Sequence, residues 1–107
     1  FTINLSVSTD GLIPSLVSDR IGVVHMYYVY LLKLKNAKKN FYIGYTSDLR
    51  RRLIEHKNGN TRTTKGKDPE LIYYEAFNSK ILAEKREEGL KTSGSVYNSL
   101  IRRLGLK

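Results

Sequence analysis

Two aromatic runs separated by a short polar segment constrain the fold of this chain most strongly. The runs are residues 26–34 (MYYVYLLKL) and 41–45 (FYIGY), and both are rich in the aromatic and aliphatic residues that favour β-strands. The segment between them, residues 35–40, is polar and rich in Lys and Asn, as expected of a turn. The pattern therefore predicts two adjacent antiparallel strands, a β-hairpin.

A helix is expected directly after the hairpin. Ser47 or Asp48 can cap its N-terminus, and apolar residues at 49, 53 and 54 recur with a helical period. The pair Asn58-Gly59 favours the end of this helix. Residues 60–70 then predict a polar, basic loop.

The C-terminal half predicts a third strand and two more helices. Residues 71–77 (LIYYEAF) are the strand, and Asn78 or Ser79 can cap the helix that follows. Gly94 separates that helix from a last helix around residues 96–104. On the apolar side of the second helix we expect Ile81, Leu82, Ala83 and Leu90. The order β-β-α-β-α-α predicts an α+β fold, a small three-stranded antiparallel sheet flanked by helices.

The first 25 residues differ from the rest of the chain in charge and composition. They hold Arg20 against Asp10 and Asp19, a net charge of −1, whereas residues 26–107 hold 18 basic and 8 acidic residues, a net charge of +10, and all 8 tyrosines. We therefore expect a domain over residues 26–107 with Met26 as its natural start. Residues 1–25 are then an extension, a cloning remnant or an upstream reading-frame translation. The alternative is an ordinary N-terminal arm that packs on the domain.

Composition excludes several classes of protein and of site. The chain has no cysteine, which excludes a disulfide scaffold, a Cys-ligated zinc site and a thiol nucleophile, and its 2 histidines argue against an all-protein zinc centre. No apolar run approaches the roughly 18–20 residues of a membrane span, and no signal peptide is recognisable. We therefore expect a cytoplasmic location and no membrane partner. The net charge of +9 instead favours a polyanionic partner.

Five polar side chains in this framework form a candidate site. Tyr30 lies in the first predicted strand, and Tyr42 lies in the second, directly before Ile43-Gly44. Arg52 and His56 are four residues apart on the first predicted helix, so they project from one face of it. Glu87 lies on the second predicted helix.

This ordered set resembles the signature of the GIY-YIG endonucleases. That signature consists of a G-I-Y strand, a Y-I-G strand shortly after it, a helix with Arg and often His, and a Glu on a later helix. The resemblance covers about residues 26–105 and is closest to the small stand-alone bacterial members. It implies the GIY-YIG nuclease fold and a metal-dependent endonuclease that hydrolyses phosphodiester bonds in DNA, with a role in DNA repair or recombination.

The resemblance also implies a role for each residue of the candidate site. Tyr30 is the general base for the attacking water, Arg52 grips the scissile phosphate, and Tyr42 and His56 position the water or a phosphate oxygen. Glu87 is the sole protein ligand of one divalent cation, Mg²⁺ or Mn²⁺. A free phenol has a pKa near 10, so Tyr30 needs nearby positive charge to act as a base at neutral pH.

The chain departs from the family signature at two places. Tyr28-Val29 stand where the family has Gly-Ile, and Tyr45 stands where many members have a Lys that assists the base. The missing Lys leaves open which group assists Tyr30. Glu84 and Glu88 remain alternatives to Glu87 as the metal ligand.

The remaining basic residues predict contacts with nucleic acid, and a solvated helix face and loop are the alternative. The candidates are Arg50, Arg51, Arg62, Lys65 and Lys67. A domain of about eighty residues leaves little room for a base-reading element, so branched, nicked or single-stranded DNA is favoured over a defined duplex site. Two alternatives stay open: a non-catalytic nucleic-acid-binding module with the same fold, and a nuclease acting on RNA. The sequence does not determine the oligomeric state.

Overall fold

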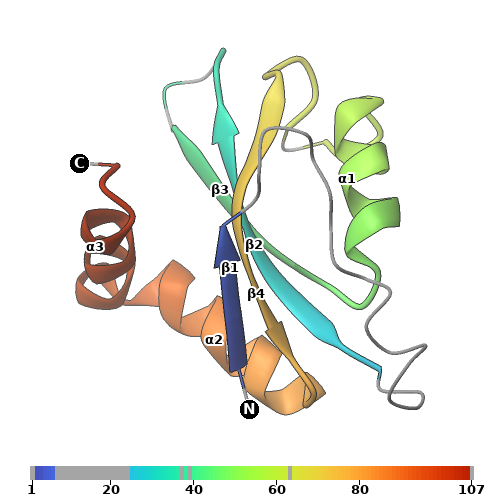
Figure 1. Cartoon of the computed structure of the whole chain (residues 1–107). Coiled ribbons are helices and arrows are strands. Elements are labelled where there is room, and N and C mark those ends of the chain that lie inside the picture. The colour runs from blue at the N-terminus through green and yellow to red at the C-terminus, as the bar shows by residue number, and fades with distance from the viewer. Residues whose placement is uncertain (1, 7–24, 37, 39, 63, 107) are drawn as a thin grey trace.

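An antiparallel sheet with helices on both faces is the framework of the molecule (Figure 1). The computed structural model describes residues 2–6, 25–36, 38, 40–62 and 64–106. Within these residues the sheet has the order β1 (Thr2–Ser6), β4 (Pro69–Phe77), β2 (Tyr27–Leu34) and β3 (Phe41–Thr46). The helices are α1 (Leu49–Lys57), α2 (Lys80–Thr92) and α3 (Gly94–Arg103). Helix α1 covers one face of the sheet, and α2 and α3 cover the other.

The predicted hairpin is present and places Tyr30 opposite Gly44. Strands β2 and β3 pair antiparallel with these two residues as register partners. Strand β2 also pairs antiparallel with β4, so it is central, whereas β3 forms an edge of the sheet. The predicted α+β fold with a three-stranded antiparallel sheet is therefore confirmed in strands β4, β2 and β3. The third strand begins at Pro69, slightly earlier than the sequence predicted.

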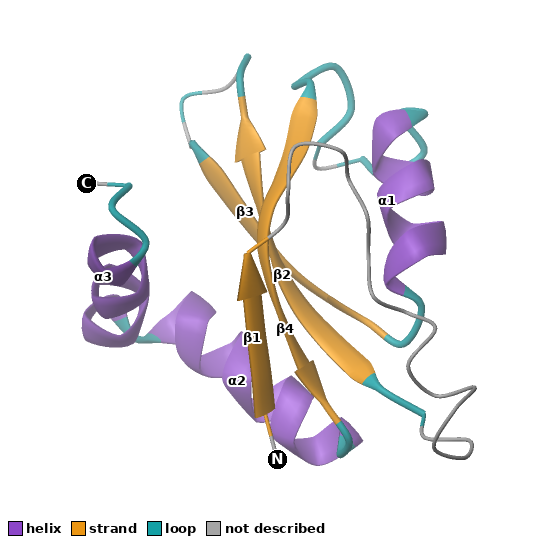
Figure 2. Cartoon of the chain, in the orientation of Figure 1, coloured by secondary structure: helices purple, strands orange, loops and turns teal. Residues whose placement is uncertain are grey.

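Helix α1 begins and ends where the sequence predicted. The Asp48 carboxylate accepts a hydrogen bond from the backbone N–H of Arg51 at 3.1 Å, which caps the helix. After the helix, Gly59 adopts a φ of 75°, a conformation that glycine tolerates and that turns the chain away. Leu49 and His56 are the buried residues of α1. The loop that follows α1 leads back to β4 (Figure 2).

Helix α2 packs on the opposite face of the sheet through a narrower apolar side than expected. Ser79 caps α2 by accepting the backbone N–H of Leu82, and Ala83 and Leu90 are buried as predicted. The prediction for Ile81 and Leu82 is wrong, because these side chains are 64% and 43% exposed. Each helical residue turns by about 100°, so both positions point away from the sheet when Ala83 faces it.

Helix α3 follows α2 after a single residue, Ser93. Ser93 caps α3 by accepting the backbone N–H of Val96, so the helix begins at Gly94, slightly before the predicted start. Gly94 is therefore the first residue of α3 and not a separate linker.

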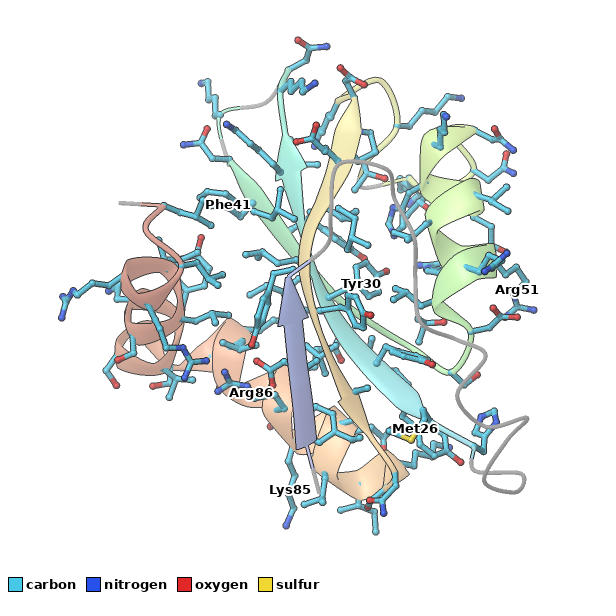
Figure 3. The ribbon with its side chains drawn as sticks, viewed as in Figure 1. Met26, Tyr30, Phe41, Arg51, Lys85 and Arg86 are labelled. Atoms are coloured by element: carbon cyan, nitrogen blue, oxygen red, sulfur yellow. The ribbon has the colours of Figure 1, made fainter. Side chains whose placement is uncertain are left out.

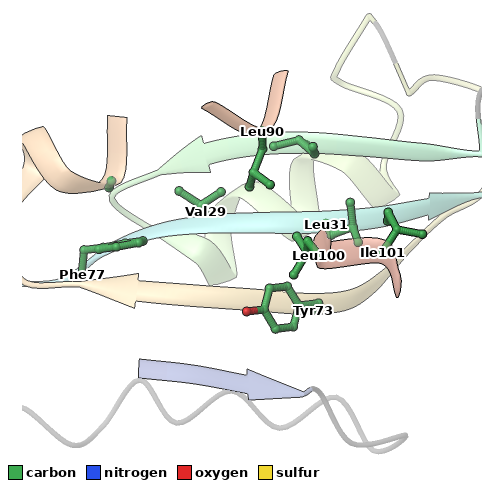
Figure 4. Close-up of a cluster of buried hydrophobic side chains, with 9 residues drawn as sticks. Val29, Leu31, Tyr73, Phe77, Leu90, Leu100 and Ile101 are labelled. Carbon is green, nitrogen blue, oxygen red and sulfur yellow. The ribbon is translucent and has the colours of Figure 1, made fainter. Parts of the chain in front are cut away.

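Two apolar clusters, one on each face, hold the helices to the sheet. The cluster between the sheet and helices α2 and α3 consists of Val29, Leu31, Ile43, Tyr73, Phe77, Ala83, Leu90, Leu100 and Ile101 (Figure 4). The cluster beneath α1 consists of Tyr30, Leu32, Leu34, Leu49 and Tyr74, with Tyr28 and Tyr42 packed against it. Strand alternation thus places Tyr28 and Tyr30 on the α1 face.

A buried ion pair ties α2 to the sheet. The Glu75 carboxylate on β4 is only 2% exposed and accepts hydrogen bonds from Arg86 Nε at 3.0 Å and Nη2 at 2.9 Å. The Tyr73 hydroxyl donates a further hydrogen bond to Glu75 at 3.0 Å. Bidentate pairing of this kind satisfies a carboxylate that would otherwise be unstable inside the protein.

Strand β1 is an addition that the sequence did not predict. It pairs antiparallel with β4, with Thr2 opposite Phe77 and Ser6 opposite Tyr73. The pairing covers the edge that β4 would otherwise expose. The predicted boundary near residue 25 depends on residues 7–24, which lie outside the described residues, so it stays a prediction. No helix in the described part of the chain is long and apolar enough to cross a membrane.

Candidate active site

Tyr30 is the centre of the candidate site and lies on the α1 side of the sheet (Figure 3). Its side chain is 1% exposed, and its ring lies directly over Gly44 of the neighbouring strand. A Cβ atom at Gly44 would come within 2.3 Å of both Cζ and Oη of Tyr30, so only glycine leaves room for the ring. The Y-I-G glycine therefore acts sterically, on the partner strand of the tyrosine.

Two side chains from α1 converge on the Tyr30 hydroxyl. His56 Nε2 is hydrogen-bonded to Oη at 2.8 Å, and Arg52 donates from Nε to the same oxygen at 3.4 Å. Their spacing of one helical turn makes this possible, because both side chains leave α1 on the face that covers the sheet. The structure thus brings Tyr30 together with Arg52 and His56, which follow it by 22 and 26 positions in the sequence.

His56 is buried and held at both ring nitrogens. Its Nδ1 is hydrogen-bonded to the hydroxyl of Thr64 at 2.7 Å, and the side chain is 2% exposed. Burial, with a smaller contribution from the positive charge of Arg52, lowers the pKa of His56 to about 4. His56 is therefore a neutral imidazole at neutral pH, with one donor and one acceptor nitrogen.

Arg52 is a permanent cation at the rim of the site. Its Nη1 donates to Glu55 at 3.0 Å, and its side chain is 35% exposed. The hydrogen bonds to Tyr30 and Glu55 raise the pKa of Arg52 above its already high ordinary value. A guanidinium held in this way presents positive charge both to Tyr30 and to an anion arriving from solvent.

Tyr42 contributes its ring to the site. It lies 5.3 Å from the His56 ring in an edge-on arrangement and 6.3 Å from the Tyr30 ring, measured between ring centroids. Edge-on aromatic pairs at such distances are favourable. Tyr42 thus limits the movement of both His56 and Tyr30.

The Tyr30 phenol is protonated at neutral pH. Burial raises the pKa of Tyr30 to about 12, and the hydrogen bond from Arg52 opposes this increase without cancelling it. The nearby charge expected from the sequence is present in Arg52, but desolvation outweighs it. To act as the general base that the sequence predicts, Tyr30 would first have to lose this proton.

Glu87 lies on α2, which packs on the face of the sheet opposite to Tyr30. Burial is the main cause of the raised pKa of Tyr30, and the negative charge of Glu87 adds the smallest contribution, whereas Glu84 and Glu87 both raise the pKa of Tyr45. The Glu87 side chain is 24% exposed, and its carboxylate pairs with Lys91 Nζ at 3.1 Å. Of these two α2 carboxylates, Glu87 is therefore the one that acts electrostatically on the Tyr30 phenol.

The donor set suits a hard, hydrated cation better than a protein-caged one. In the described part of the chain no three His, Asp or Glu side chains lie close enough together to bind a metal ion as a group. Mg²⁺ commonly keeps several water ligands and uses one or two carboxylates together with substrate phosphates. A partly exposed single carboxylate such as Glu87 fits that mode of binding.

The predicted nucleic-acid contacts follow α1 and the loop after it. Arg50 and Arg51 are exposed on α1, and Arg51 points away from the sheet (Figure 3). Arg62 and Lys65 are exposed on the loop, and Lys67 is partly exposed. These five residues belong to the same stretch of chain that supplies Arg52 and His56, and their contact with nucleic acid stays a prediction.

Two contacts of the site were not evident in the sequence. Thr64, in a polar loop, contacts His56, and Lys91, on α2, contacts Glu87. The i, i+4 spacing of Glu87 and Lys91 is a readable signal for an ion pair. No pattern in the sequence distinguishes Thr64 from the other threonines of its loop.

The chain matches one protein family and several known proteins. The GIY-YIG catalytic domain matches residues 26–98. The chain is 40% identical over 68 residues to a UPF0213 protein of Staphylococcus saprophyticus, and the match covers 62% of this chain and 80% of that relative. UPF0213 proteins of Clostridium perfringens and Natronomonas pharaonis are also 40% identical over 68 residues, 62% of this chain, with 71% and 78% of their own lengths covered.

The names of these relatives state no activity, and no solved structure matches the chain. The family match spans strands β2, β3 and β4, helices α1 and α2, the first part of α3 and all the site residues described above. The chain therefore belongs to the GIY-YIG family of nucleases.

Proposed function

We propose that this chain is a divalent-metal-dependent endonuclease that hydrolyses phosphodiester bonds in DNA, with its catalytic domain over residues 26–107. The observation that carries the proposal is the convergence of Arg52 and His56 on the Tyr30 hydroxyl. A buried phenol with a cation and a neutral imidazole against its oxygen is more elaborate than packing requires. It is an arrangement suited to moving a proton next to an anion.

The role of each side chain follows from its position. Tyr30 takes the proton of the attacking water, and Arg52 binds the scissile phosphate because its guanidinium is partly exposed and charged at all relevant pH values. His56 assists Tyr30 through the hydrogen bond to Oη, a task that the family often gives to the Lys absent here. Tyr42 holds both rings in place.

Glu87 is the proposed ligand of Mg²⁺ or Mn²⁺. Its partly exposed carboxylate leaves room for water and phosphate oxygens to complete the coordination. When bound there, the cation supplies positive charge that stabilises the developing charge on the phosphate. Glu88 lies at the next position of α2, which makes it a suitable control for Glu87.

An unpaired strand is the proposed substrate feature, and a groove beside the site supports it. The groove has a volume of about 720 Å³, and its walls include Phe41, Tyr42, Lys91 and Tyr97. Aromatic side chains stack on unpaired bases, and this stacking does not require a defined sequence. Tyr42 and Lys91 connect the groove to the site, because they contact His56 and Glu87 respectively. Branched, nicked or single-stranded DNA therefore fits better than intact duplex.

The test is cleavage of a panel of DNA structures with and without Mg²⁺. Glu87→Gln and Tyr30→Phe should each lower the rate by roughly 10²-fold or more, whereas Glu88→Gln should cleave like the wild type. Equal cleavage by all four proteins would point to a contaminating nuclease and refute the proposal. Cleavage of the matching RNA in preference to DNA would assign the activity to RNA instead.

The rival proposal is a nucleic-acid-binding module without turnover. Binding without cleavage by the wild type, at every DNA structure and with Mg²⁺ or Mn²⁺, would favour it. In both cases affinity should fall steeply as salt rises, because Lys and Arg displace counterions from phosphates. Removing the charges of Arg62 and Lys65 should reduce that salt dependence, since both are exposed on the loop beside α1. A cytoplasmic location remains a prediction from the sequence.

A further inference from the structure

Thr64 is completely buried in the loop between α1 and β4, although the loop is polar and basic. Its exposed fraction is 0%, and its hydroxyl lies 2.7 Å from His56 Nδ1. Neither the family match nor the sequence pattern assigns it a role. A fully buried threonine that contacts the partner of the proposed base is therefore a candidate for one.

The three side chains form an unbroken chain of hydrogen bonds that starts at Tyr30. Tyr30 Oη is bonded to His56 Nε2 at 2.8 Å, and His56 Nδ1 is bonded to Thr64 Oγ1 at 2.7 Å. A protonated Tyr30 donates to Nε2, so neutral His56 carries its proton on Nδ1 and donates it to Thr64. Because a hydroxyl can also donate, Thr64 keeps His56 hydrogen-bonded when the imidazole changes tautomer.

A charged imidazole is unfavourable at this position. Burial and the charge of Arg52 both oppose protonation of His56, as its lowered pKa of about 4 reflects. If His56 takes the Tyr30 proton at Nε2, it must therefore give up its proton at Nδ1 to remain neutral. Among the described residues, the group that contacts Nδ1 is Thr64.

We propose that Thr64 is a positioning residue for His56 and the outer member of a buried relay through which the hydroxyl proton of Tyr30 leaves. The Tyr30 O–H bond breaks as Nε2–H forms, and Nδ1–H breaks as a new O–H bond forms on Thr64. The original hydroxyl proton of Thr64 passes to water. Tyr30 is then a phenolate that accepts from Arg52 Nε and His56 Nε2, and His56 is neutral before and after.

A second threonine hydroxyl is buried in the same turn as Thr64. Thr61 lies in the same turn, since its carbonyl accepts the backbone N–H of Thr64 at 3.2 Å. Its Oγ1 is buried and has no hydrogen-bond partner among the described residues. Buried polar groups of this kind are commonly satisfied by an internal water.

The first test reads the tautomer of His56 directly and needs no cleavage assay. Nitrogen-15 NMR of the imidazoles is simple here, because the chain has 2 histidines and the other, His25, is exposed and serves as the reference. At neutral pH we expect wild-type His56 in the Nδ1–H tautomer. Thr64→Ser should keep it, and Thr64→Val should shift it toward Nε2–H. A wild-type protein with His56 in the Nε2–H tautomer would contradict the relay without any variant.

The second test uses cleavage and rests on the proposed nuclease function. Thr64→Val should lower kcat by about tenfold or more with little change in KM, and Thr64→Ser should restore kcat. Ser99→Ala, which removes an exposed hydroxyl on α3 outside the groove, is the control and should cleave like the wild type. Unchanged kcat in Thr64→Val overturns the relay and leaves the nuclease assignment intact. The expected tautomer shift in a protein that cleaves nothing would refute the nuclease function and still support the role of Thr64 in positioning His56.

Discussion

Gly44 and Tyr30 face each other across β3 and β2, and the tyrosine ring occupies the space where a side chain at 44 would lie. A Cβ atom at Gly44 would be 2.3 Å from Cζ and Oη of Tyr30, well inside van der Waals contact. The hydroxyl that this arrangement sets in place is the one that His56 and Arg52 contact. The glycine of the Y-I-G strand and the tyrosine of the first strand are therefore one steric unit.

Gly44→Ala should displace the Tyr30 ring and break its hydrogen bond to His56. We expect cleavage to fall by roughly 10²-fold and the free energy of unfolding to fall by about 1–3 kcal/mol, the usual cost of overpacking. The measurements are a cleavage rate and a denaturant unfolding curve.

Gly89→Ala is the control, because a Cβ at Gly89 in α2 meets nothing within 4 Å. That variant should keep its activity and gain up to about 1 kcal/mol from helix propensity. Full activity in Gly44→Ala would show that the close approach is unimportant.

The free energy of unfolding should fall as the pH drops from about 6.5 to about 4, because His56 is buried as a neutral imidazole. The pKa of His56 falls from 6.5 to about 4 on folding, mainly through burial and then through Arg52, with Glu55 acting in the opposite direction. The unfolded chain binds the proton first, so stability is complete above pH 6.5 and is lost on acidification. The loss is about 3 kcal/mol in total.

Denaturant unfolding of the wild type and of His56→Gln across this pH range measures that effect. The difference between the two proteins should shrink toward low pH, since carboxylates titrate equally in both. His25→Gln, at an exposed position, should follow the wild type at every pH. A constant difference between wild type and His56→Gln would contradict the expectation.

Arg86 and Glu87 are adjacent in sequence, but we expect Arg86 to stabilise the fold and Glu87 to bind the metal ion. Arg86 points toward the sheet, where it pairs with buried Glu75 (Figure 3). Arg86→Met should lower the free energy of unfolding by about 3–5 kcal/mol because it leaves that carboxylate unpaired. The double variant Arg86→Met/Glu75→Leu should recover most of the loss. Thermal or denaturant unfolding measures this loss, and Lys85→Met, at an exposed position, is the control. If Arg86→Met were as stable as the wild type, the ion pair between Arg86 and Glu75 would not contribute to stability.

Lys91 should compete with the metal ion for Glu87. The ammonium lies 3.1 Å from the carboxylate on a half-exposed side chain, so its removal frees the proposed ligand at little structural cost. An ion pair of this spacing is worth a few tenths of a kcal/mol, which corresponds to about a twofold lower Mg²⁺ requirement in Lys91→Met. The measurement is a Mg²⁺ titration of cleavage at saturating DNA, with Lys85→Met as control. A higher Mg²⁺ requirement in Lys91→Met would show that the lysine helps the cation to bind.

Local patterns in the sequence were sufficient for strands β2 to β4, for the three helices and for the residue types of the five predicted site residues, but not for strand β1. The aromatic runs specify the hairpin, and Asp48 and Ser79 specify the helix starts, because capping and strand preference are short-range effects. The i, i+4 spacing of Arg52 and His56 specifies that they share a face, since helical geometry is the same in every fold. Ile81 is exposed against expectation, because its hydropathy is local whereas its orientation depends on which side of α2 packs on the sheet.

Only the tertiary structure decided how those residues are used. Burial raised the pKa of Tyr30 and lowered that of His56, and burial is a property of the whole packed core beneath α1. Thr64 entered the site because its loop folds back against α1, a contact that no spacing in the sequence specifies. The sequence alone therefore determined the fold class and the family, since these rest on periodicity and on residues in a fixed order. The hydrogen-bonded chain from Arg52 through Tyr30 and His56 to Thr64 required the structure, because desolvation and contact between distant segments exist only after the chain has packed.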